Sequence, residues 1–349
     1  MTAYVSLSAR VLVNVEALNM AESVGNYIKH RRVPVVVEED GSTVVKYVPA
    51  VSGESVGHGY QAILAQLARQ AGLPVCDNCY KEVFTKHASK EMFGTSDWEQ
   101  KLKELIRKKD GFSPTQFEAE VIRNCVVEDL GGFLYAEEPF QVKRSSLFST
   151  GYLIPAADAL RSVAVEPQFH VRYSPARPEE GQAIYYVEIG SAVYTLSFVI
   201  DVARIGWTKL AEVKDVIGEA ERKKRVEVAL KSLAAMIVGP LFGAKRTRFL
   251  PSWEVRSIVA AVSGPMPFIT SPGHTKDYLS STALRAKEFV KAMNHGNTDL
   301  KQQVTIYYYN GEGLTTPSED VSPAVLKPGF ASPEELFATL ITDVVGVSG

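Results

Sequence analysis

Residues 4–15, YVSLSARVLVNV, alternate between apolar and polar side chains with a period of two. One face of this segment carries Val5, Leu7, Ala9, Val11, Val13 and Val15, and the other carries Ser6, Ser8, Arg10, Leu12 and Asn14. A period of two is that of a β-strand with one face buried, so we predict a half-buried strand. Residues 32–51 then place β-branched runs on both sides of EDGS, which predicts a β-hairpin. The chain therefore begins by building a sheet.

Helical patterns alternate with strand patterns in the rest of the chain. Residues 52–72 carry apolar side chains at helical spacing, with Ser52 as the predicted N-cap and Glu54 in the first turn. A second strong helix is predicted within 218–239. Further strands are predicted within 168–174, 182–201, 254–263 and 302–310, and further helices within 97–111, 113–132, 281–294 and 332–345.

Two stretches interrupt this order. Residues 76–130 are helical and charged, which predicts an inserted lobe, and residues 131–156 are rich in glycine, serine and aromatic residues, which predicts a projecting hairpin or long loop. Without them the order is strand, hairpin, helix, strands, helix, strand. This order is typical of a ferredoxin-like or RRM-type core, whose open sheet face often binds single-stranded RNA. We predict an α+β fold with such a core, a helical insertion and a hairpin insertion.

The charge balance limits the classes of partner. The formal net charge of −2 at pH 7 argues against a surface that binds polyanions everywhere, so any nucleic-acid binding must come from local clusters. No run approaches the 18 apolar residues that a membrane span needs, and the N-terminus has no basic start or cleavage site. We therefore expect a cytoplasmic protein without membrane contact.

Three cysteines are too few for a disulfide framework, which fits a reducing compartment. Cys76 and Cys79 have the spacing of half a zinc site, with His87 and Cys125 as conceivable further ligands. A second Cys-x-x-Cys or a His-x-x-x-His is missing. The sequence therefore favours small buried cysteines, with no metal and no cofactor.

The segment 239–254, GPLFGAKRTRFLPSWE, links the second strong helix to a strand and carries Lys245, Arg246 and Arg248. It is not a phosphate-binding Walker A loop, because it runs from helix to strand, has only three residues between its glycines and lacks the hydroxyl after the lysine. Gly239 and Gly243 let the backbone approach a partner closely, and the cations suit phosphates. An ordinary solvated turn is the alternative.

Three other segments could bind anions. The turn before the first helix offers amides at a helix N-terminus, with His58 close by. Lys29, His30, Arg31 and Arg32 lie in a predicted loop and could follow an RNA backbone. His170 and Arg172 share one face of a predicted strand. A capped helix, a solvated loop and a structural histidine are the respective alternatives.

Several of these segments resemble, in order, the backbone subunit of archaeal type I CRISPR surveillance complexes (Cascade), the autoregulator DevR-like family of the repeat-associated RNA-binding superfamily. The matching segments are VNVEALNMAESVGNYIKHRRVPVV, YVPAVSGESVGHGYQA, GGFLYAEE, QFHVRYS and FGAKRTRFLPS. The resemblance covers nearly the whole chain.

The resemblance implies a crescent-shaped subunit with an RRM-like palm in 1–75 and 166–349, a helical finger in 76–130 and a thumb-like hairpin in 131–165. Copies would stack head to tail along a guide RNA and pair with target DNA through that guide, beside other Cascade subunits. Of the RNA-binding residues that we predict, the resemblance implies Ser52, Gly53, His58, Lys143, Arg144, His170, Lys245, Arg246 and Arg248, and the residue patterns add Asn19, Lys29, His30, Arg31, Arg172 and Gly243. No catalytic residue is implied.

Two rival readings stay open. An RNA-processing endonuclease on the same fold could use His58 or His170 as a general base, although no second catalytic partner stands at a convincing spacing. An enzyme could also bind a small phosphorylated ligand at the N-terminus of the first helix.

Overall fold

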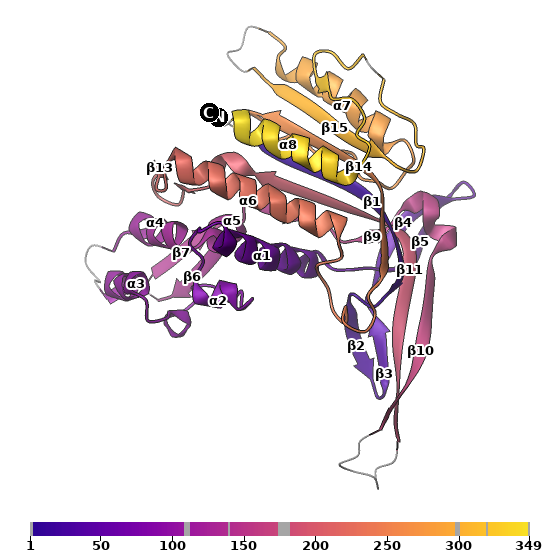
Figure 1. The fold of residues 1–349 in the computed structure, drawn as a ribbon, viewed down its shortest axis with the longest axis horizontal. Coiled ribbons are helices and arrows are strands. Elements are labelled where there is room, and N and C mark those ends of the chain that lie inside the picture. Colours follow the sequence, from indigo (N-terminus) through magenta and orange to yellow (C-terminus); the bar gives the residue numbers. More distant parts are fainter. Residues whose placement is uncertain are drawn as a thin grey trace.

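The computed structural model describes residues 3–107, 112–138, 140–173, 182–296, 301–318 and 320–347. Positions 108–111 of one predicted helix, 174 of one predicted strand and 139 of the predicted hairpin insertion lie outside these ranges. The described chain is a mixed α and β structure built on one large sheet (Figure 1). No helix of the described residues is long and apolar enough to cross a membrane.

The large sheet mixes parallel and antiparallel pairs in the order β16-β15-β14-β1-β11-β3-β2. These strands are β1 (Tyr4–Glu16), β2 (Met20–Val24), β3 (Tyr27–His30), β11 (Gln182–Asp201), β14 (Ser252–Gly264), β15 (Gln303–Asn310) and β16 (Val325–Leu326). The central strand β1 pairs antiparallel with both β11 and β14. Strands β8 (Phe148–Thr150), β9 (Ile154–Pro155) and β10 (Ala164–Tyr173) pair with successive parts of β11.

Helices cover both faces of the sheet. Helices α1 (Gly53–Gln70), α6 (Glu219–Val238) and α8 (Pro333–Val347) lie together over one face, and α7 (Tyr278–Met293) packs on the other face of β14 and β15. The alternation of β14 explains this division, because Ile258 and Ala260 enter the first core while Val259 and Ala261 enter the second.

The expected open face of β1 is closed, which corrects the half-buried interpretation. Ser6, Ser8 and Arg10 are all nearly inaccessible to solvent. Ser6 Oγ donates to the carbonyl oxygen of Phe268 at 2.8 Å, and Ser8 Oγ lies 3.0 Å from Thr270 Oγ1. The Arg10 guanidinium is held by Asp158 and Glu312. The segment before α7 therefore covers the polar face with hydrogen-bonding groups, and the centre of the sheet offers no RNA platform.

The predicted hairpin and the first helix are confirmed. Strands β4 (Arg32–Glu39) and β5 (Ser42–Pro49) pair across Asp40 and Gly41, which have φ of 50° and 78° as a two-residue hairpin turn requires. Ser52 caps α1, since its Oγ accepts a hydrogen bond from the N–H of Ser55 at 3.2 Å.

The helical lobe is present, but the hairpin insertion folds differently from the prediction. The lobe contains α2 (Asp77–Tyr80), a 3-10 turn (Lys90–Met92), α3 (Asp97–Arg107), α4 (Pro114–Asn124) and α5 (Val126–Gly131). Strands β6 (Phe133–Glu137) and β7 (Phe140–Arg144) pair with each other and pack into the core of the lobe. A hairpin is therefore present within 131–165, but it packs on the lobe, and it is β10 and β11 that extend away from the body (Figure 1).

A buried cluster of four charged side chains joins the lobe to α6. Arg225 of α6 is fully buried and donates to Asp129 Oδ2 and to the carbonyl oxygen of Ile122, both at 2.8 Å. Arg144 of β7 is held by Glu118 and Asp129. Because each guanidinium has an opposite charge and carbonyl partners, the burial of these charges is compensated. We call Glu118, Asp129, Arg144 and Arg225 the buried charge cluster.

Short elements connect these parts. They are two 3-10 turns (Ala157–Ser162 and Val202–Arg204) and the strands β12 (Trp207–Thr208) and β13 (Lys214–Asp215).

Candidate nucleic-acid interface

The basic loop after α6, residues 239–251, lies against the turn that follows β1. Gly243 has a φ of +86°, and a Cβ there would stand 2.8 Å from both the Cβ and the carbonyl oxygen of Leu18. The N–H of Ala244 donates to that carbonyl oxygen at 2.7 Å. Only glycine fits this position, because both the backbone conformation and the contact exclude a side chain.

The side chain of Asn19 joins three of the predicted segments. Its Oδ1 accepts a hydrogen bond from Arg31 Nε at 2.8 Å and another from the N–H of Ser52 at 2.9 Å. The N–H of Arg31 also donates to the carbonyl oxygen of Asn19 at 2.8 Å. Leu18, which precedes Asn19, contacts the basic loop. The basic loop, Arg31 and the N-cap of α1 therefore lie together around residues 18 and 19.

The first turn of α1 lies next to Asn19 and the basic loop. A Cβ on Gly53 would lie 3.0 Å from the carbonyl oxygen of Thr150, so β8 closes against the first turn of the helix. Farther along the helix, a Cβ on Gly59 would stand 2.2 Å from the Cβ of Phe242. The basic loop is therefore fixed to α1 by a glycine contact and by a buried aromatic ring. N–H groups of the first helical turn lack intrahelical partners, and the helix dipole adds positive potential there.

His170 connects β10 to the basic loop. Its ring stacks on Tyr185 with centroids 5.2 Å apart and meets the ring of Phe249 edge-on at 5.4 Å. Its Nε2 is buried without a hydrogen-bond partner among the described residues. An unpaired ring nitrogen beside a basic loop can serve a hydrogen bond to a bound ligand.

The cations of the basic loop have no carboxylate partner among the described residues. Within the part of the chain that the structure describes, no carboxylate pairs with Lys245, Arg246 or Arg248, and Arg246 Nη1 contacts only the carbonyl oxygen of Pro240, at 3.3 Å. By contrast, Lys29 pairs with Glu22 at 3.5 Å. The loop therefore presents charge to an external anion, whereas the charge of Lys29 is partly satisfied.

His30 is a structural residue, and its prediction as an exposed contact is wrong. The side chain is buried, with Nε2 2.5 Å from Glu16 Oε1 and Nδ1 donating to the carbonyl oxygen of Arg31 at 2.8 Å. Burial acts to lower the pKa of His30, but the hydrogen bond and charge of Glu16 outweigh it and raise the pKa. Glu16 Oε2 also accepts from the N–H of Leu18 at 2.7 Å. This pair therefore fixes the turn that carries the interface.

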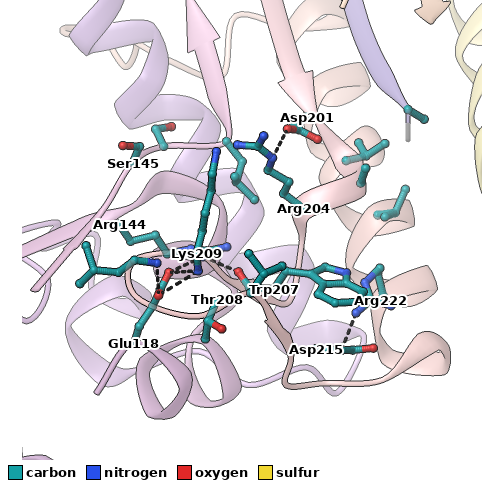
Figure 2. Close-up of a pocket in the computed structure, with 18 of the residues that line it drawn as sticks. Glu118, Arg144, Ser145, Asp201, Arg204, Trp207, Thr208, Lys209, Asp215 and Arg222 are labelled. Carbon is teal, nitrogen blue, oxygen red and sulfur yellow. Dashed lines mark hydrogen bonds and ion pairs between the residues drawn. The ribbon is translucent and has the colours of Figure 1, made fainter. Parts of the chain in front are cut away.

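Lys143 and Arg144 lie elsewhere. Arg144 belongs to the buried charge cluster, so its prediction as an exposed cation is wrong. Both residues line a separate pocket with Asp201, Arg204, Lys209 and Arg222, shown in Figure 2. This pocket includes Glu219, the first residue of α6, whereas the basic loop follows the last residue of that helix. Since α6 has 20 residues, about 30 Å separate its ends.

The pocket in Figure 2 also has a different character from the interface. Acidic side chains interleave with its basic ones, and Asp201 and Asp215 pair with Arg204 and Arg222 at 3.2 and 2.5 Å. Several of the charges there are paired within the protein, unlike those of the basic loop among the described residues.

The remaining predicted residues have mixed positions. Arg172 is exposed on β10, two residues beyond His170. His58 is exposed on α1, and its ring contacts Phe84 at 4.7 Å. Neither His58 nor His170 hydrogen-bonds a carboxylate of the described residues. These side chains can therefore contact an anion, and neither histidine forms an acid–base pair with a carboxylate among the described residues.

Phe249 and Thr150 belong to the interface but escaped the sequence analysis. Phe249 stands beside Arg248 within the basic loop, so an aromatic residue next to a cation was the available signal. No signal marked Thr150, because its part is a carbonyl oxygen against Gly53.

Comparisons with known proteins identify the family of the chain. The sequence model of one family, described as "CRISPR-associated negative auto-regulator DevR/Csa2", matches residues 7–283. The chain is 38% identical over 315 residues to "CRISPR-associated aCascade subunit Cas7/Csa2 2" of Saccharolobus solfataricus, covering 89% of this chain and 93% of that protein. It is 35% identical to "CRISPR-associated protein Cas7/Csa2 1" of the same organism, covering 90% and 95%.

A solved structure supports the fold. A chain of a "CRISPR RNA-guided surveillance complex, pre-nicking" aligns with a TM-score of 0.52 at 12% identity, covering 99% of this chain and all of that one.

Proposed function

This chain belongs to the DevR/Csa2 family of CRISPR-associated proteins, and from that premise we propose that it is a guide-RNA-binding backbone subunit of a type I surveillance complex. The observation that carries the proposal is that one loop, with cations that no carboxylate of the described residues pairs, contacts the turn that lies beside Asn19 and the α1 N-terminus, and also the strand that carries His170. These groups come from segments far apart in the sequence, and they share an affinity for phosphate.

The core of the subunit is of the RRM type. In support, β1, α1, β11, α6 and β14 follow one another along the chain, and the sheet places β1 between β14 and β11. Strands β8, β9 and β10 occupy the position beyond β11. This is the order of a split βαβ core with two helices on one face.

The subunit binds the sugar–phosphate backbone of the RNA and does not cleave the RNA. Arginine and lysine bind phosphates irrespective of base, so sequence reading is left to pairing between guide and target DNA. One near-neutral copy offers few cations, but copies stacked head to tail along a guide multiply the contacts, and an interface whose rotation does not close forms a helical filament. Other subunits of the complex would occupy the ends.

Binding to single-stranded RNAs of graded length tests this function. We expect affinity to rise with RNA length and to fall steeply with salt as counterions are released. Electron microscopy should show helical arcs only when RNA is present. Affinity that saturates with a single nucleotide, together with thermal stabilisation by nucleotides, would instead support the small-ligand enzyme.

Arg246→Ala sharpens the test. It should weaken binding similarly across RNA sequences and lower the salt slope by about 1. Arg107→Ala is the matched control, because Arg107 is an exposed arginine at the end of α3 in the helical lobe. A loss confined to some sequences would contradict a phosphate contact.

The endonuclease reading has its own outcome in the same experiments. Repeat RNA incubated with the protein should stay intact, with or without a chelator. Specific cleavage that His58→Ala or His170→Ala abolishes would overturn the non-catalytic role.

A further inference from the structure

The three cysteines of the chain meet at one point in the helical lobe. Cys76 caps α2, Cys79 lies within that helix, and Cys125 stands at the junction of α4 and α5. All three are buried free thiols. Glu128 of α5 reaches the same point and is fully buried. The ligand atoms of these four residues all lie within 4.8 Å of one another.

Three of the separations are close to those of a tetrahedral zinc site. Cys125 Sγ lies 3.6 Å from Cys76 Sγ, and Glu128 Oε1 lies 3.4 Å from Cys76 Sγ and 3.9 Å from Cys79 Sγ. With Zn–S of about 2.3 Å and Zn–O of about 2.0–2.2 Å, the ligands of a tetrahedral site stand about 3.5–3.8 Å apart. The observed set needs only small shifts to surround one ion.

Buried packing alone does not account for this arrangement. Small buried cysteines need no carboxylate beside them, yet the fully buried Glu128 reaches the same point. Glu128 Oε1 faces the thiols and accepts from His87 Nδ1 at 2.7 Å. The second ring nitrogen of His87 lies 3.3 Å from Glu99 Oε1. A histidine between two carboxylates, one of which points into a thiol cluster, is typical of the shell that orients a metal ligand.

We propose that Cys76, Cys79, Cys125 and Glu128 bind one structural Zn²⁺, with His87 positioning Glu128. The thiols release their protons when they bind the ion, and the thiolate-rich tetrahedral set selects zinc over harder cations such as Mg²⁺ and Ca²⁺. The N–H of Cys79 lies 3.5 Å from Cys76 Sγ, where it can stabilise the thiolate. The site is closed, so its role is to tie α2 to the α4–α5 junction.

This proposal reverses the expectation of no metal from the sequence. Only half of the ligand set has a recognisable spacing, because the other half is a lone cysteine and a glutamate. His87, conceived from the sequence as a ligand, contacts Glu128 instead.

Metal content of the full-length protein tests the proposal. After incubation with Zn²⁺ under reducing conditions and gel filtration, elemental analysis should find one zinc per chain. Chelation should lower the Tm, and added Zn²⁺ should restore it. Co²⁺ in place of Zn²⁺ should give thiolate-to-metal charge-transfer bands and the intense visible bands of tetrahedral cobalt, a readout that needs no variant.

Variants then assign the ligands. Cys79→Ser and Cys125→Ser should each lose stoichiometric zinc, and His87→Gln should weaken zinc binding by about 10–100-fold. Asp77→Asn is the matched control, since its side chain lies between two ligands in sequence but is 83% exposed. Unchanged zinc affinity in Glu128→Gln would overturn the carboxylate ligand. A zinc-free protein after reconstitution, with three free thiols or a disulfide by thiol titration, would overturn the site.

Discussion

Asn19→Ala removes the side chain on which the candidate interface converges. The substitution deletes two hydrogen bonds, from the N–H of Ser52 and from Arg31 Nε. Ser52 is 4% exposed, so its N–H is left without a partner, and that costs about 1–3 kcal/mol. Arg31 is partly exposed, so water replaces its lost bond and the loss there is about 0.5 kcal/mol. We expect the free energy of unfolding to fall by about 1.5–3.5 kcal/mol.

Asn19→Asp separates the fold from binding. A carboxylate accepts the same two hydrogen bonds, and its charge favours Arg31. Stability should therefore stay within about 1 kcal/mol of wild type, while RNA affinity falls because a negative charge stands among the binding groups.

Urea unfolding followed by circular dichroism measures the stability of both variants, and filter binding at two salt concentrations measures RNA affinity. Asn14→Ala is the matched control, because the side chain of Asn14, on β1, makes no hydrogen bond to a described residue. If Asn19→Ala stays within about 0.5 kcal/mol of wild type, as an ordinary surface substitution does, the inference that Asn19 holds the segments together is refuted.

Three further perturbations probe the surroundings of the interface. Gly243→Ala should cost about 1–2 kcal/mol from its positive φ alone, with more from the contact with Leu18, and should weaken RNA binding; unfolding in urea and RNA titration check both effects. His30→Gln should destabilise most between pH 4.5 and 6.5, because the lowered pKa of Glu16 and the raised pKa of His30 keep both groups charged there. The difference from wild type should shrink as the pH rises through the raised pKa of His30 or falls through the lowered pKa of Glu16, and a pH series of melting curves would show a flat difference if the pair were inert. Arg225→Met should lower the free energy of unfolding by about 3–5 kcal/mol, because Asp129 loses one of its two guanidinium partners inside the protein. Limited proteolysis of this variant should then cleave the lobe first.

Local patterns in the sequence predicted local structure well. The β-branched runs around Asp40 and Gly41 predicted the β4–β5 hairpin, and Ser52 predicted the start of α1, because turn and cap chemistry depend on nearest neighbours. The alternation of 4–15 predicted β1 correctly as a strand.

The tertiary contacts that cover each face of a strand could not be predicted in the same way. The polar face of β1 is buried because Phe268 and Thr270 supply hydrogen-bonding partners from the other end of the chain. Burial of His30 and Arg144 has the same origin, since Glu16 and Glu118 reach them through tertiary contacts. A basic residue therefore indicates a surface only when no distant carboxylate pairs with it, and sequence spacing carries no such information. The basic loop has no such carboxylate among the described residues.

The buried charge cluster has a mechanical consequence. Hydrogen bonds between guanidinium and carboxylate groups are directional, so they resist sliding more than aliphatic contacts do. Arg225 lies on α6 while Asp129 lies in the lobe, so their ion pair ties the lobe to that helix. We expect the lobe and α6 to move together, so that curvature in any stack of copies would come from the contacts between copies.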